Sequence, residues 1–196
     1  MVYMKAKLVT DRQTGVRTVV IGTTRGETLD EARARLLSAG RQYMLPFTFE
    51  RSVQETTYRY DVTSYSTLHD LLRSPIPAGV YAGLLLGVLG VIEGCAAHGV
   101  PESCVAWDPK FVFMSPQGFP LFAVAPVLRP ANVRQNATTL LETLRDKARC
   151  TSPEEQEYRQ RLREFLAANP VVTPPAFHGF MAWLLPGYVR SSAAGP

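Results

Sequence analysis

The sequence has few cysteines and no block of like charge, and both absences narrow the classes of protein that it can encode. Its 196 residues include three cysteines, Cys95, Cys104 and Cys150, which are odd in number and widely spaced. This pattern argues against a disulfide framework and fits a reducing compartment. The net charge is +4, but lysine and arginine are scattered among acidic residues. No nucleic-acid partner is therefore implied.

The first 15 residues also lack an apolar signal core and a small-residue cleavage site. Nothing directs export, so we expect a cytoplasmic protein. A hydrophobic content of 46% is enough for one full core, which we place over residues 1–189. Residues 190–196, RSSAAGP, have the composition of a linker, so we expect a further domain to follow.

The most informative feature is the apolar run over residues 76–100. Five glycines recur there at helical spacing, Gly79, Gly83, Gly87, Gly90 and Gly94. They share one helix face, and because each costs on the order of 1 kcal/mol relative to alanine, we expect other backbone to approach it closely. A membrane helix associating through Gly83 and Gly87 is one interpretation. The charge-free run ends at Glu93, short of the roughly 20 residues of a span, so we expect a buried central helix without membrane insertion.

The residues before this helix predict a strand-rich region. Strands are expected over residues 5–10, 17–23, 47–53 and 56–62, the first two joined by the turn DRQTG, and helices over 27–39 and 66–73. The helix over 27–39 would start at Thr28 or Gly26, end at Gly40, and bury a stripe of Leu29, Ala32, Leu36 and Leu37. Ser66 would cap the short helix.

The residues after the glycine helix predict short strands and then helices. Strands are expected over residues 104–107, 111–115 and 121–127, and helices over 137–149, 152–168 and 176–185. Ser152 and Glu155 would form a capping box. The order is that of a small two-lobed protein-kinase-like α+β fold, with an N-lobe over about 1–63, a helical C-lobe over about 64–189, and the glycine-striped helix at its centre.

Three segments carry a family resemblance: residues 56–72 (TTYRYDVTSYSTLHDLL), the apolar helix, and residues 105–127 (VAWDPKFVFMSPQGFPLFAVAPV). The matching motifs are Tyr60-Asp61, Asp108-Pro109 and Pro116-Gln117-Gly118. The chain resembles the kinase-like domains of uncertain function that precede phosphothreonine-reading FHA domains in bacteria. More remotely, it is similar to the cytosolic pseudokinase domain of the type VII secretion component EssB.

The motifs of phosphoryl transfer are not in place. Only Gly15 lies where a glycine-rich loop would cover the phosphates, and residues 18–21 contain no lysine. If His98-Gly99-Val100 replaces His-Arg-Asp, Val100 stands where the catalytic base would be. Residues 121–127 contain no Asp-Phe-Gly to hold magnesium. The sequence therefore predicts a pseudokinase, without enzymatic activity and without a cofactor.

Other chemistry has weaker support. Cys95, His98 and Cys104 have a spacing that can supply three zinc ligands, but no fourth ligand is visible, and buried thiols with a helix-capping histidine account for them better. We assign no catalytic, cofactor-binding or metal residue. Asp61 and Asp108 are candidate cleft positions, although each is more simply a turn residue. Trp183 is a candidate partner-binding position, although it is more simply packing between helices.

These observations favour a non-catalytic protein-interaction module in a bacterial cytoplasmic signalling scaffold, joined to an FHA domain. The alternative is the cytosolic recognition domain of a membrane-bound, type VII-like secretion component. A third hypothesis is an unrecognised enzyme that uses Asp61, His98 or Asp108. The expected partner is another protein of unknown identity, and pairing of the domain with itself stays open.

Overall fold

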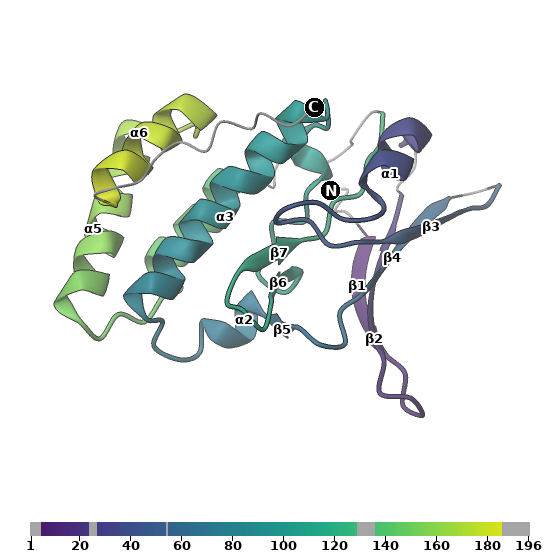
Figure 1. Ribbon diagram of the computed structural model, residues 1–196, viewed down its shortest axis with the longest axis horizontal. Helices are drawn as coiled ribbons and strands as arrows, with labels where there is room; N and C mark the ends of the chain where they lie inside the picture. The colour runs from purple at the N-terminus through teal and green to yellow at the C-terminus, as the bar shows by residue number, and fades with distance from the viewer. Residues whose placement is uncertain (1–4, 24–26, 54, 129–135, 186–196) are drawn as a thin grey trace.

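The structure, a computed structural model, describes residues 5–23, 27–53, 55–128 and 136–185. It is a mixed α+β fold in which strands dominate the N-terminal region and helices dominate the C-terminal region, as expected (Figure 1). Buried apolar side chains from both regions form one continuous core. The linker expected over residues 190–196 lies outside the described residues, as does Gly26, one of the two expected caps.

The first sheet is antiparallel and has four strands. In spatial order they are β1 (Lys5–Thr10), β2 (Arg17–Gly22), β4 (Thr56–Asp61) and β3 (Thr48–Arg51). The expected hairpin joins β1 to β2, with Gly15 at a φ of +71°. Tyr58 and Tyr60 of β4 are fully buried, and they lie opposite Ile21 and Val19 of β2. One face of this sheet therefore covers the core, as the alternating pattern of β4 predicted.

Helix α1 (Glu31–Leu37) follows β2 and is shorter than predicted. It begins after Asp30, whose carboxylate accepts the backbone N–H of Arg33, so Thr28 is not the cap. Leu29 forms an isolated bridge with Val127 instead of joining the helix. The predicted stripe is right for Leu29 and Leu37, which are buried, and wrong for Ala32 and Leu36, which are exposed; within α1 the buried residues are Ala34 and Leu37. As predicted, Gly40 follows the end of this helix, with a φ of +79°.

Helix α3 (Ala78–Ala97) is the central helix of the fold. It contacts α6 (Pro174–Leu184), α5 (Pro153–Ala168) and β7 (Pro120–Phe122), and Figure 1 shows it crossing the middle of the molecule. With 20 residues and a mean hydropathy of 1.9 over its most apolar window, it has the length and composition of a membrane span, contrary to the expected shortfall. However, 56% of that window is buried inside the domain, as in a core helix. A single apolar helix of this kind is weak evidence for a membrane span.

The glycine stripe of α3 faces two different environments. A Cβ added at Gly87, Gly90 or Gly94 would meet Pro120, Tyr43 or Met44, respectively. A Cβ added at Gly79 or Gly83 would meet nothing within 4 Å. The expected close approach of backbone is thus wrong: side chains, two of them from the loop after α1, fill the narrow half of the stripe, and the other half is open.

A second, smaller antiparallel sheet lies beside α3. It consists of β5 (Ser66–Thr67), β6 (Val112–Met114) and β7. Thr67, not Ser66, caps the short helix α2 (Leu68–Leu71), because Thr67 directly precedes the helix and its hydroxyl accepts the backbone N–H of Asp70 at 3.1 Å. The strand expected over residues 104–107 is wrong: Glu102–Cys104 is a 3₁₀ helix, η1, and Val105 makes an isolated bridge with Val124.

The C-terminal region consists of α4 (Ala137–Lys147), α5 and α6. The predicted capping box at Ser152 and Glu155 is present at the start of α5. Phe165 of α5 stacks with Phe177 and Phe180 of α6, with ring centroids 5.7 Å and 4.5 Å apart. These rings fix α6 against α5 on the side of α3 that faces away from the first sheet (Figure 1).

Candidate functional site

A hollow of about 320 Å³ lies where the first sheet meets the second, and we call it the junction hollow. It is lined by residues of β1, β2, β5, α2 and the segment leading into β6, namely Leu8, Arg17, Thr67, His69, Asp70, Lys110 and Phe111. The Arg17 guanidinium donates a hydrogen bond to the carbonyl of Tyr65, 2.9 Å away, which holds β2 beside the chain entering β5. This is the place where a cleft between two lobes was expected.

The chemistry of the junction hollow is cationic and apolar. Its one lining carboxylate, Asp70, accepts a hydrogen bond of 2.6 Å from the hydroxyl of Thr67 in the cap of α2. Within the described part of the chain, Arg17 and Lys110 have no carboxylate at ion-pair distance. The hollow therefore suits an acidic or apolar group more than it suits a cation.

Asp61 and Asp108 lie near this hollow but are not among the residues that line it. Asp61 accepts hydrogen bonds from the backbone N–H and the hydroxyl of Thr63, at 3.0 and 2.6 Å. These bonds hold the pKa of Asp61 below its usual value, and the bond from the Thr63 hydroxyl has the larger effect. Asp108 accepts the backbone N–H of Lys110 at 2.9 Å. Each carboxylate thus stabilises its own turn, the simpler of the two roles considered for it.

Trp183 lies on α6, which is on the far side of α3 from the first sheet (Figure 1). Trp183 is 52% exposed, and the guanidinium carbon of Arg161 lies 4.4 Å from its ring centroid. Phe180 packs at a centroid distance of 6.2 Å. The structure therefore does not bring the three candidate positions together, and Trp183 is a separate exposed aromatic position.

The cysteines and histidine considered for zinc have other roles. The Nδ1 atom of His98 lies 2.7 Å from the carbonyl oxygen of Gly94, at the end of α3. The thiol of Cys104 points to the carbonyl of Val127 at 3.8 Å, and burial raises the pKa of Cys95 to about 12. In the described ranges, no three His, Cys, Asp or Glu side chains form a group able to hold a metal ion.

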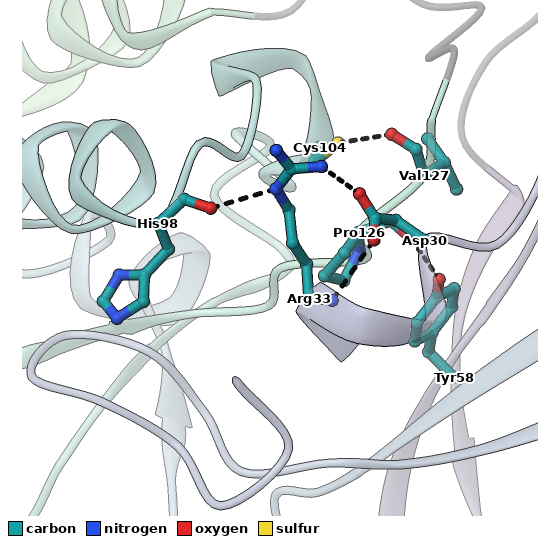
Figure 2. A network of polar contacts seen from close by, with 7 residues as sticks. All are labelled: Asp30, Arg33, Tyr58, His98, Cys104, Pro126 and Val127. Atoms are coloured by element: carbon teal, nitrogen blue, oxygen red, sulfur yellow. Dashed lines mark hydrogen bonds and ion pairs between the residues drawn. The ribbon is translucent and has the colours of Figure 1, made fainter. Parts of the chain in front are cut away.

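A polar network that sequence reasoning missed joins the two regions (Figure 2). Arg33 pairs with Asp30 and donates through Nε to the carbonyl of His98, 3.0 Å away. Tyr58 donates its hydroxyl to the carbonyl of Pro126, which also accepts the backbone N–H of Asp30. The spacing of Asp30 and Arg33 indicates a local pair, but the carbonyls they meet come from distant segments, so no sequence signal identifies them.

A second hollow of about 620 Å³, the aromatic groove, lies between the loop after α1 and the turn joining β6 to β7. Its apolar lining consists of Tyr43, Tyr65, Pro116, Phe119 and Leu121. Tyr43 has a φ of +64°, a left-handed conformation that costs a non-glycine residue roughly 1 kcal/mol or more. Hydrogen bonds between this loop and Phe122, together with the packing of the ring on Gly90, hold that conformation.

Comparison with known proteins adds no family assignment: no protein-family model and no curated protein matches this chain.

Proposed function

We propose that this domain is a non-catalytic, pseudokinase-like protein-interaction module of a bacterial cytoplasmic signalling scaffold, linked to a phosphothreonine-reading FHA domain. One observation carries the proposal: Asp61 and Asp108, the acids considered for a cleft, are held in their own turns, and Asp70, the carboxylate that lines the junction hollow, is held in the cap of α2. Carboxylates that are engaged in turns and in a helix cap are poorly placed to hold the magnesium that a triphosphate requires, so the lining favours a protein segment over a metal-bound triphosphate.

The arrangement of elements also supports the proposal. The elements follow one another in the order expected of a small kinase-like domain: the first sheet with its intervening helix, the connector α2, the long helix α3, the hairpin β6–β7 and the final helices. Val100, in the position considered for the catalytic base, is buried and carries no proton-accepting group. Exposed apolar side chains remain on β1, on the aromatic groove and on α6, which are surfaces available to partners.

The first experiment measures the melting temperature of the purified domain with and without ATP and magnesium. A ligand present at about 100 times its Kd stabilises a folded protein by about 2.7 kcal/mol, so specific binding gives a clear rise. The proposal predicts no rise and no transfer of labelled γ-phosphate to the domain or to a generic protein substrate. A nucleotide-dependent rise accompanied by transfer would show that the domain is an enzyme.

The second experiment tests the interaction claim. Wild-type domain and the Lys110→Glu variant are immobilised and exposed to the same bacterial lysate. Because Lys110 is exposed and has no ion-pair partner in the described chain, its reversal should leave the fold intact. We expect at least one protein to be retained by the wild type and lost with the variant. Identical sets of retained proteins would place the binding surface away from the junction hollow.

A further inference from the structure

Strand β1 forms one edge of the first sheet, and within the described residues no strand pairs with its outer side. Nearly the whole strand is exposed, including two large apolar side chains, Leu8 at 40% and Val9 at 43%. An exposed edge strand presents unpaired backbone N–H and C=O groups and can accept another strand. The outer side of residues 5–10 is called the β1 edge below.

The hydrogen bonds of the hairpin show which groups the β1 edge offers. The backbone N–H of Asp11 donates to the carbonyl of Val16, opposite it, at 2.9 Å. Because bonded and non-bonded pairs alternate along an antiparallel ladder, the odd-numbered residues of β1 bond to β2. The N–H and C=O groups of Ala6, Leu8 and Thr10 therefore point outward, over a span long enough for a short added strand.

The side chains along this edge alternate in chemistry between the two faces of the sheet. Lys5, Lys7 and Val9 lie on the solvent-facing side, where Val20 of β2 and the carboxylate residue Glu55 line the same hollows. Ala6 and Leu8 lie on the other side, and Leu8 lines the junction hollow together with Phe111. The solvent-facing side therefore carries two lysines of β1 against one neighbouring acid, Glu55, and the other side is apolar and borders the junction hollow.

From this juxtaposition we infer that the β1 edge binds an extended segment of another protein whose residues alternate between acidic and apolar side chains. Backbone groups of the segment pair with Ala6, Leu8 and Thr10. Its acidic side chains lie beside Lys5 and Lys7, and its apolar side chains lie beside Leu8 and enter the junction hollow. The inference rests on the proposed function, because it names the surface and the class of partner of that interaction module.

Two alternative roles for the β1 edge fit its residues less well. Lysines on an edge strand commonly prevent pairing, but a strand that is only protected needs no exposed Leu8 and Val9 between its charges. A second copy of the chain would bring its own Lys5 and Lys7 to the same edge, which adds like charge. An acidic strand removes that repulsion, so charge complementarity favours a different protein.

The test uses a fluorescent eight-residue peptide that alternates glutamate and valine, titrated with the full chain and followed by anisotropy. Its control has the same composition, with four glutamates followed by four valines, so that net charge and hydrophobicity are unchanged. We expect saturable binding of the alternating peptide and at least tenfold weaker binding of the block peptide. Equal affinity for both peptides, or no binding of either, overturns the inference.

A matched pair of variants tests the backbone pairing. Ala6→Pro removes an outward N–H and leaves the β1–β2 hydrogen bonds in place, whereas Ala6→Ser keeps that N–H. We expect at least a tenfold loss of affinity for Ala6→Pro and less than a twofold change for Ala6→Ser, with both variants folded by circular dichroism. Equal affinity of a folded Ala6→Pro variant and the wild type contradicts strand addition.

A charge reversal keeps the inference falsifiable if proline unfolds the edge. Lys5→Glu combined with Lys7→Glu should transfer preference from the glutamate–valine peptide to a lysine–valine peptide of the same pattern, because both lysines are exposed and only the sign of the charge changes. Unchanged preference overturns the role of these lysines.

The possible failures of the two proposals are distinguishable. A dimer that forms with rising concentration, is lost in Ala6→Pro and excludes the peptide would make a second copy the occupant, which overturns this inference. If the peptide does not bind but the domain still retains a lysate protein in a Lys110-dependent manner, the edge inference is wrong and the interaction module stands. If the peptide binds but the domain also turns over ATP, the edge inference stands and the proposal of a non-catalytic module is wrong.

Discussion

Gly87 of α3 lies directly beneath the ring of Pro120, the first residue of β7. A Cβ at position 87 would come within 3.0 Å of both Cγ and Cδ of that proline. Both residues are buried, and the pyrrolidine ring cannot rotate away as a flexible side chain can. This contact sets how closely the second sheet approaches the central helix, and with it the position of the chain that lines the junction hollow.

The contact predicts opposite effects for two alanine substitutions on the same helix face. Gly87→Ala should lower the free energy of unfolding by about 1 to 3 kcal/mol, because the added methyl overpacks against Pro120. Gly83→Ala should raise it by up to about 1 kcal/mol, because nothing lies within 4 Å of its Cβ and alanine favours the helix. Urea titration of both variants measures the difference. Equal destabilisation by both would mean that the two halves of the stripe are packed alike.

The glycine stripe also illustrates how far the sequence predicts this fold. Spacing alone identified the helix and the shared face, because helical periodicity is a local property. It did not predict that Tyr43 and Met44, which lie far earlier in the chain, would fill part of that face. Such contacts depend on tertiary packing, which no local pattern encodes.

Prediction of the helix caps and of the candidate site from the sequence was limited in the same way, because both depend partly on tertiary contacts. The sequence predicted Ser66 as the cap of the short helix, but α2 begins one residue later than that cap implies, so Thr67 takes the position. The turn roles of Asp61 and Asp108 could be predicted from local chemistry, because each carboxylate accepts the backbone N–H of the residue two positions later. The position of Leu8 beside Phe111 depends on which strand lies at the sheet edge, which is a property of the topology.

Buried tyrosine hydroxyls join the first sheet to residues 124–127, and their removal should measurably destabilise the domain. Tyr60 is fully buried, and its hydroxyl donates to the carbonyl of Val124 at 2.9 Å. Burial raises the pKa of Tyr60 well above its usual value, so the hydroxyl stays protonated over the whole working pH range. Tyr60→Phe should cost about 0.5 to 1.5 kcal/mol in urea unfolding, because a buried carbonyl loses its donor.

The matched control for Tyr60→Phe is Tyr158→Phe on α5. The Tyr158 hydroxyl donates to Glu154 at 3.0 Å at an exposed position, where water can replace the lost bond. This variant should change the unfolding free energy by less than about 0.5 kcal/mol. If both variants lose the same stability, the bond to Val124 contributes nothing beyond an exposed one.

The capping box of α5 predicts a pH dependence. The Glu155 carboxylate accepts the backbone N–H groups of Ser152 and Thr151, at 2.9 and 2.5 Å, and these bonds lower its pKa from the usual 4.5. A carboxyl whose folded-state pKa is depressed contributes stability above its unfolded-state pKa and loses it as the pH falls through the folded-state pKa. Wild type should therefore melt at a higher temperature than Glu155→Gln at pH 7, and the difference should shrink as the pH falls below 4.5.

Glutamine can still accept a hydrogen bond in a capping box, so Glu155→Gln isolates the charge from the geometry. Glu155→Ala removes both and should stay less stable than Glu155→Gln at every pH. A difference between wild type and Glu155→Gln that is the same at pH 3 and pH 7 would contradict the assigned ionisation.

Substitution of the two tryptophans of the chain should lower the free energy of unfolding by very different amounts. Trp107 is 1% exposed and packs on Phe122, with ring centroids 5.5 Å apart, so Trp107→Ala should cost about 3 to 5 kcal/mol or prevent folding. Trp183 is 52% exposed, and its contact with Arg161 is an exposed cation–π pair worth about 0.5 to 1 kcal/mol. Trp183→Ala should therefore cost less than about 1.5 kcal/mol in urea unfolding.

The same variant separates the two exposed surfaces of the domain. Because α6 lies across α3 from the first sheet, Trp183→Ala should leave binding of the alternating glutamate–valine peptide at the β1 edge within twofold of wild type. A large loss of peptide affinity in a folded Trp183→Ala variant would place the peptide on α6. Loss of a lysate partner without loss of peptide affinity would instead identify Trp183 as part of a second, independent binding surface.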